Sequence, residues 1–181
     1  MLTRFALLLA LAVTLGLAGC GGDDENSAES WANDVCSSLS TWLTDIDEAV
    51  QSLTEGGLST AEEDIEAAVD QIGDATDNLA NDLEELGPPE TEGGEQARSE
   101  IESLATTLQS EVETVQQSVD SDQGALSVTS TVSMSISSAA TAVQSTLSDL
   151  EEVDPGGELR DGFESADECD SFRDQIEELG S

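Results

Sequence analysis

The chain of 181 residues contains no histidine, no lysine and no tyrosine. Without histidine, the sequence cannot support Ser-His-Asp or Cys-His catalysis, zinc sites of the Cys/His kind, or the Glu-x-x-His ligands of di-iron bundles. It also contains neither a Gly-x-Gly-x-x-Gly sequence nor a P-loop. Because so few chemistries remain open, we expect a protein that is not an enzyme and that uses no cofactor.

Aromatic side chains are scarce, since two Trp and three Phe make up 3% of the chain. A pair of carboxylates can hydrolyse a glycosidic bond, but a sugar site also needs aromatic platforms, and the core needs the few aromatics present. Trp31 and Trp42 share one helical face with Val35, Leu39 and Ile46. We therefore interpret the tryptophan cluster as core rather than as a ligand site.

Basic residues are almost as rare, with four Arg against 41 acidic residues and a formal net charge of −37. Such a charge excludes nucleic acid as a partner, because binding to nucleic acid depends on Lys and Arg side chains that neutralise its phosphates. It also disfavours close contact with an anionic lipid surface. Two interpretations of the acid stay open: a solvated surface that keeps the protein soluble, or a surface for cations or a basic partner.

The first 19 residues have the pattern of a secretory signal, in which Arg4 precedes an apolar run over 5–18 that is short for a membrane span. The run ends in Leu17-Ala18-Gly19-Cys20, which resembles a bacterial lipobox. The resemblance implies cleavage before Cys20, lipidation of its thiol, and a location on the outer face of the plasma membrane. Residues 20–29 would then be a flexible tether. An ordinary signal peptide and an uncleaved anchor are the alternatives.

Residues 30–181 are predicted to form one all-α domain. Gly- and Pro-rich punctuation separates four long segments whose apolar residues recur three and four apart. Matched lengths and short connections favour an up-down-up-down four-helix bundle, with a short fifth helix in the tail and a bend at Gly162. The predicted core stripes are Trp31, Val35, Leu39, Trp42, Ile46, Ala49 and Leu53; Ile65, Ala68, Val69, Ile72, Ala75, Leu79, Leu83 and Leu86; Ala97, Ile101, Leu104, Leu108, Val112, Val115 and Val119; Val128, Val132, Ile136, Ala139, Val143, Leu147 and Leu150; and Leu159, Phe163, Ala166, Cys169, Phe172, Ile176 and Leu179.

Two local patterns bear on the helix boundaries. The second segment opens with Ser59-Thr60-Ala61-Glu62, a capping box for a helix start. Residues 126–137 alternate apolar and polar, and their β-branched content suits a strand. No other segment alternates, and a lone strand is unstable, so we predict helix there.

Cys36 and Cys169 remain once Cys20 is assigned to lipid. The compartment outside the membrane is oxidising, so a pair of cysteines there is expected to bridge. In an up-down-up-down bundle the fourth helix ends at the pole where the first begins, which brings both cysteines to that pole. A bond between them would staple the C-terminal helix to the bundle. The alternative is two reactive thiols, but no basic residue adjoins either to lower its pKa.

Two loops invite a functional interpretation. Asp120-Ser121-Asp122-Gln123-Gly124 begins like an EF-hand loop, but Ala125 replaces the required Gly and Thr131 the required Glu. We interpret this loop as an acidic turn and predict no metal site. The segment G-P-P-E-T-E-G-G over 87–94 is either a docking loop for a partner or a stiff turn.

Three short elements, W-A-N-D-V-C, L-G-P-P-E-T-E-G-G and A-D-E-C, resemble a group of small actinobacterial secreted proteins and lipoproteins. The resemblance covers most of the chain after residue 19. It implies an all-helical domain outside the cytoplasm, in which two cysteines recur in these elements, and it implies no biochemical role.

These observations predict a lipid-anchored helical bundle that acts without catalysis as an interaction or structural module of the cell envelope. Its partners would be the membrane, through lipid on Cys20, and an envelope protein that the sequence does not identify. The alternative is a ligand- or cation-binding lipoprotein. An apolar pocket between helices would favour the alternative, because small-molecule sites are concave and largely apolar; a filled core would weaken it.

Overall fold

The computed structural model describes residues 27–55, 62–121 and 125–179, and these residues form helices joined by short connections. The helices are α1 (Ala28–Glu55), α2 (Glu62–Leu86), α3 (Gly94–Asp120), α4 (Ala125–Glu152), α5 (Glu158–Ser165) and α6 (Asp167–Leu179). The described part of the chain contains no strand, and residues 126–137 belong to α4, so the helix predicted there is confirmed.

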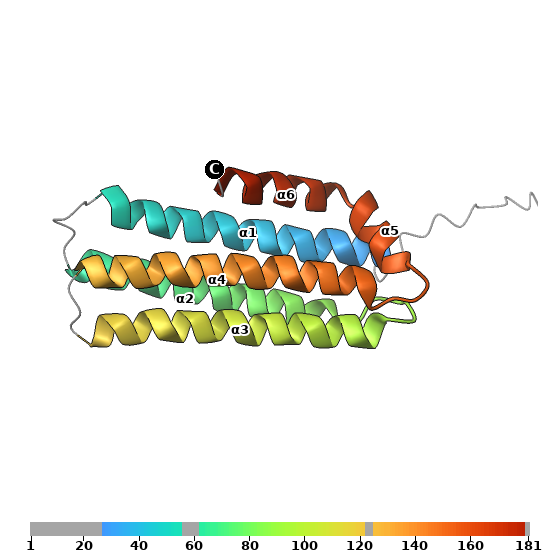
Figure 1. Cartoon of the computed structure of the whole chain (residues 1–181), viewed down its shortest axis with the longest axis horizontal. Coiled ribbons are helices and arrows are strands. Elements are labelled where there is room, and N and C mark those ends of the chain that lie inside the picture. The colour runs from blue at the N-terminus through green and yellow to red at the C-terminus, as the bar shows by residue number, and fades with distance from the viewer. Residues whose placement is uncertain (1–26, 56–61, 122–124, 180–181) are drawn as a thin grey trace, which may run out of the picture.

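The four long helices lie side by side and alternate in direction (Figure 1). α1 packs on α2, α2 on α3 and α3 on α4, whereas α1 and α4 meet much less closely. α5 and α6 pack on α1, and α6 runs along its outer side (Figure 1). The predicted up-down-up-down bundle is confirmed. Within the described residues, none of the helices combines the length and apolarity that crossing a bilayer requires.

One continuous core runs through the bundle, and most residues of the predicted apolar stripes belong to it. Leu86, Val112, Val119 and Ile176 are half-buried and pack against it, and the side chain of Leu179 lies outside the described part of the structure. Trp31, Val35, Leu39, Trp42 and Ile46 of α1 are all buried. The stripe of α4 is split, since Val128, Val132, Ala139, Val143 and Leu150 are buried while Ile136 and Leu147 are half-buried. The partial exposure of Ile136 and Leu147 shows that the seam beside α4 is not fully closed.

Both tryptophans belong to this core, and each indole N–H forms a hydrogen bond within the bundle. Nε1 of Trp31 donates to the Gly87 carbonyl at 3.0 Å, and Nε1 of Trp42 donates to the Thr76 hydroxyl at 3.2 Å. Trp31 also meets Phe163 of α5 edge to face, with ring centroids 6.0 Å apart. The cluster therefore joins α1 to α2 and α5, as its interpretation as core predicts. Trp42 is buried but also lines the groove described below, so for this residue core and candidate ligand site are not alternatives.

The tail differs from the single bent helix predicted for it. The chain turns at Ala166, whose backbone is extended (φ −76°, ψ 113°), so α5 and α6 are separate helices. Gly162 lies inside α5 and does not mark the bend. A Cβ atom there would lie 2.7 Å from the backbone carbon of Ala28, so the glycine is needed where α5 presses against the start of α1.

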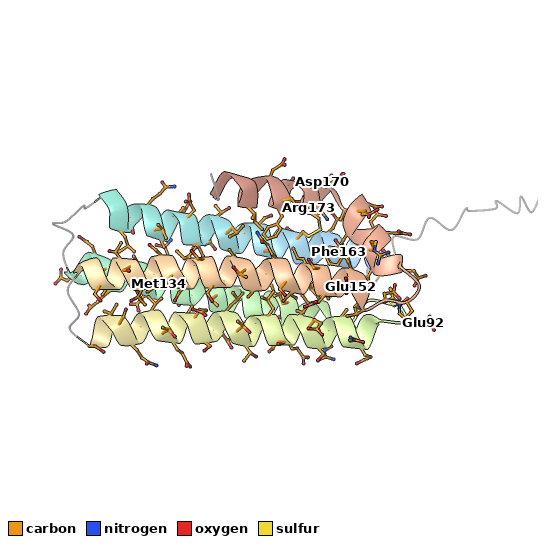
Figure 2. All side chains as sticks on the ribbon, in the orientation of Figure 1. Glu92, Met134, Glu152, Phe163, Asp170 and Arg173 are labelled. Carbon is orange, nitrogen blue, oxygen red and sulfur yellow. A yellow bond between two sulfur atoms is a disulfide. The ribbon has the colours of Figure 1, made fainter. Side chains whose placement is uncertain are left out.

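The 87–94 loop is a packed turn. Pro89, Gly93 and Gly94 are buried, and a Cβ atom on Gly94 would overlap the Pro89 carbonyl oxygen. Gly87 has φ +64°, a left-handed conformation that glycine adopts without strain. Only acidic side chains such as Glu92 project outward (Figure 2). These contacts support the interpretation of the loop as a stiff turn.

Four predictions concern residues outside the described part of the structure. Ser59 of the capping box is not described, nor are residues 122–124 of the acidic turn. Cys20 and the rest of residues 1–26 are likewise outside the described ranges, so lipidation and the tether stay predictions.

Candidate ligand groove

An open groove lies along the loosely packed seam between α1 and α4, and α6 flanks it. Its volume is about 350 Å³, which is within the range of small-molecule sites. Nine of its twelve lining residues are apolar, and the other three are Asp47, Ser137 and Gln144. The apolar lining comprises Trp42, Leu43, Ile46 and Val50 of α1, Ile136, Ala140 and Val143 of α4, and Phe172 and Ile176 of α6.

The groove exists because the three helices present side chains of unequal size. α4 contributes the small residues Ser137 and Ala140, whereas α1 contributes Trp42 and Ile46. Phe172 of α6 is 1% exposed and packs at the edge of the same seam. Small residues on one wall and bulky ones on the other leave space that the bundle does not fill.

A second hollow of about 400 Å³ continues the groove toward α5 and shares Gln144, Phe172 and Ile176 with it. This end is more polar because it also includes Ser148, Glu151 and Arg173. The combined cavity is therefore apolar near the middle of the bundle and polar near its α5 pole.

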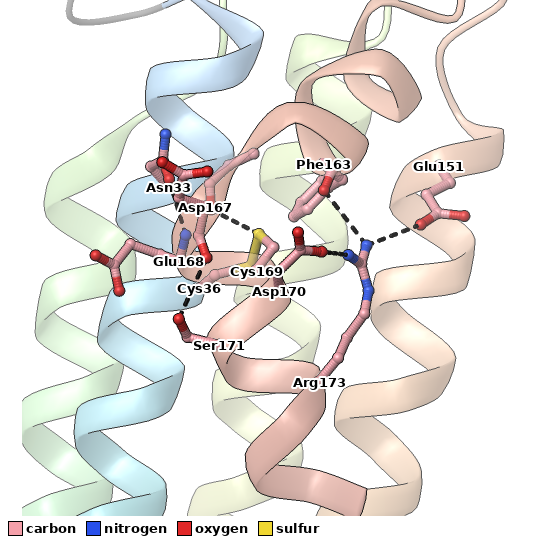
Figure 3. The surroundings of a disulfide bond; sticks show 11 residues. Asn33, Cys36, Glu151, Phe163, Asp167, Glu168, Cys169, Asp170, Ser171 and Arg173 are labelled. Carbon is pink, nitrogen blue, oxygen red and sulfur yellow. Dashed lines mark hydrogen bonds and ion pairs between the residues drawn. A yellow bond between two sulfur atoms is a disulfide. The ribbon is translucent and has the colours of Figure 1, made fainter.

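Arg173 reaches from α6 toward α4 at the polar end (Figure 3). Its guanidinium lies 2.9 Å from the Asp170 carboxylate and 4.0 Å from that of Glu151, and it donates to the Phe163 carbonyl at 3.3 Å. The cation is thus paired to two carboxylates. Its role here is to tie α6 to α4 and α5.

Cys36 of α1 and Cys169 of α6 form a disulfide, which holds α6 against α1 beside the groove (Figure 3). The predicted pairing is confirmed, and the two reactive thiols are excluded. The Asn33 side chain accepts a hydrogen bond from the Glu168 amide at 3.2 Å, which satisfies one free amide of the first turn of α6. Both contacts fix where α6 starts.

Asp154 positions α5 in a similar way. Its buried carboxylate accepts hydrogen bonds from the amides of Gly156 (3.2 Å) and Leu159 (3.1 Å). Arg160 in turn donates to the Glu151 carbonyl at 3.2 Å. Several polar contacts therefore hold the α4–α5 connection. They fix the position of α5, from which the chain continues into α6.

Three ionisable side chains line the two hollows: Asp47, Glu151 and Arg173. Among the described residues, no group of three or more His, Cys, Asp or Glu side chains is arranged to hold a metal ion. Asp47 lines the groove and accepts a hydrogen bond from Gln51, whereas Glu151 lines the second hollow.

The sequence did not identify the groove, although one signal was available. Cys36, Leu43 and Val50 lie along the edge of the α1 stripe and require a neighbour beyond α2. Cys36 meets α6, while Leu43 and Val50 line the groove.

The chain was compared with protein-family models, curated proteins and solved structures, and none of them matches it. The resemblance to small actinobacterial lipoproteins stays a prediction. Interpretation of the groove therefore rests on its own residues.

Proposed function

We propose that the protein is a lipid-anchored module on the outer face of the plasma membrane, and that it binds a small apolar ligand without catalysis. The lipobox at 17–20 supports the anchor and the location. The groove between α1, α4 and α6 supports ligand binding, and it is the observation on which this proposal depends.

The groove favours a ligand-binding module over one that docks another protein. Leu43, Val50 and Ile136 border a seam that the side chains of the protein leave unfilled. Apolar surface that stays in contact with water costs free energy, and a bound apolar ligand would cover it. The 87–94 loop, which could have docked a partner, is packed against its own turn through Pro89 and Gly94, and it offers little surface beyond exposed acid.

Uptake of an uncharged apolar dye tests ligand binding. Nile red should bind the protein with a stoichiometry near one and quench Trp42, which lines the groove. The variant Trp31→Phe leaves Trp42 as the sole tryptophan, because the chain has two. Ala140→Leu should block uptake by filling the groove, whereas Thr141→Leu, on the exposed side of α4, should not. Equal uptake by both variants would contradict the proposal.

Metabolic labelling with palmitate tests the anchor. The chain should incorporate label, and Cys20→Ala should abolish incorporation and release the protein from the membrane. The control is the double variant Cys36→Ala/Cys169→Ala, which removes the two disulfide-bonded cysteines and should stay labelled. A Cys20→Ala protein that is labelled as strongly as the parent would contradict lipid attachment at this residue.

A further inference from the structure

We infer that the ligand is a single-chain amphiphile with a positively charged head, whose apolar chain lies between α1 and α4. This inference rests on the proposed function and names the class of ligand. It follows from the shape of the groove, from the composition of its walls and from the charges beside it.

The shape suits a chain rather than a compact molecule. The two hollows share Gln144, Phe172 and Ile176 in their linings, so together they follow the helices from the level of Val50 to that of Cys36. An elongated cavity that opens to solvent along its length accommodates an alkyl chain and leaves the head outside.

The walls suit an alkyl chain. α4 carries no charged residue from Ala125 to Ser148, although the whole chain has a net charge of −37. The α1 wall is apolar apart from Asp47. Each methylene group transferred from water into such surroundings contributes favourably to binding.

The charges select the head group. Asp47 lines the groove on α1 between Ile46 and Val50, and Glu151 lines the hollow toward α5. Arg173 is the basic residue among those lining the two hollows, and its guanidinium is already paired with Asp170 and Glu151. Asp47 has no basic residue beside it in the lining of the groove, so a cationic head near it would meet a carboxylate inside a strongly negative field, whereas an anionic head would be repelled.

Three amphiphiles with similar alkyl chains separate the contribution of the head group from that of the chain. They are dodecyltrimethylammonium, which is cationic, dodecyl maltoside, which is neutral, and dodecanoate, which is anionic. Each is titrated below its micelle concentration into the whole Trp31→Phe protein, with Trp42 fluorescence as the measurement. We expect the cation to bind at least tenfold more tightly than the anion, with the neutral compound between them. Raising the salt concentration should narrow the difference, because mobile ions screen exposed charges.

Matched variants separate binding in the groove from adsorption on the acidic surface. Asp47→Asn should weaken binding of the cationic amphiphile about twofold to fivefold, which is the range expected for the loss of a single exposed charge pair. Glu48→Gln removes the same charge from an exposed neighbour outside the groove and should change affinity less. Ala140→Leu should abolish binding of all three compounds.

The outcomes are distinct. If Nile red binds but dodecanoate binds as tightly as the cation, the head-group inference is wrong and the proposed function stands. If neither the dye nor any amphiphile binds, the proposed function fails with it. If the cation binds equally to the Ala140→Leu protein, it is adsorbed on the surface, and the inference is overturned.

Discussion

Removal of the Cys36–Cys169 disulfide should destabilise the protein strongly and loosen α6 first. The bond joins residues 133 apart, and for a loop of that length the chain-entropy model gives about 5 kcal/mol of stabilisation. Whole domains are stable by only about 5–15 kcal/mol, so the loss is a large fraction of the total. α6 has 13 residues, which is marginal for an isolated helix, and it depends on docking.

The variant is Cys36→Ala/Cys169→Ala, compared with Cys20→Ala as a control that keeps the bond. Denaturant unfolding should show a loss of several kcal/mol, with about 5 kcal/mol as the upper limit. Hydrogen exchange should quicken in α6 before α2 and α3. Fluorescence should report a more exposed Trp31, because its partner Phe163 lies on α5. A loss below about 1 kcal/mol with α6 amides still protected would refute this reasoning.

Three further substitutions test individual contacts. Gly162→Ala should be less stable than Gly73→Ala by about 1–3 kcal/mol, since both gain helix propensity but only the first meets backbone within 3 Å; equal stability in thermal unfolding would contradict this. Asp154→Ala should cost about 0.5–2 kcal/mol by removing the hydrogen bonds at the start of α5, seen as faster exchange there. Thr76→Val should cost about 1–3 kcal/mol by leaving the Trp42 indole unpaired, whereas Thr76→Ser should restore most of it.

The helices and the disulfide were predictable because they depend on periodicity and topology. Apolar residues three and four apart define a buried face whatever the neighbours are, so Trp31, Leu39 and Trp42 could be assigned to the core. Antiparallel connections then fix which poles meet, which is why Cys36 and Cys169 could be paired. Even the alternating residues of α4 were assigned correctly, since a lone strand has no partner.

The break at Ala166 and the groove were not predictable in the same way. A stripe shows which side of a helix is buried but not how closely two helices approach. The α1–α4 spacing depends on Ser137 and Ala140 facing Trp42, and on Phe172 arriving from a third helix. The prediction of a bend at Gly162 was wrong for a similar reason. The glycine is required by a tertiary contact with Ala28, not by a local turn.

The most direct test of the proposed ligand groove is a crystal structure of the protein purified from its native source, without added amphiphile during crystallisation. The account predicts that α1 and α4 stay apart along the seam, with elongated density between Trp42 and Phe172. A structure in which the seam is closed by direct contact of α1 with α4, or is filled by side chains of the protein itself, would contradict it.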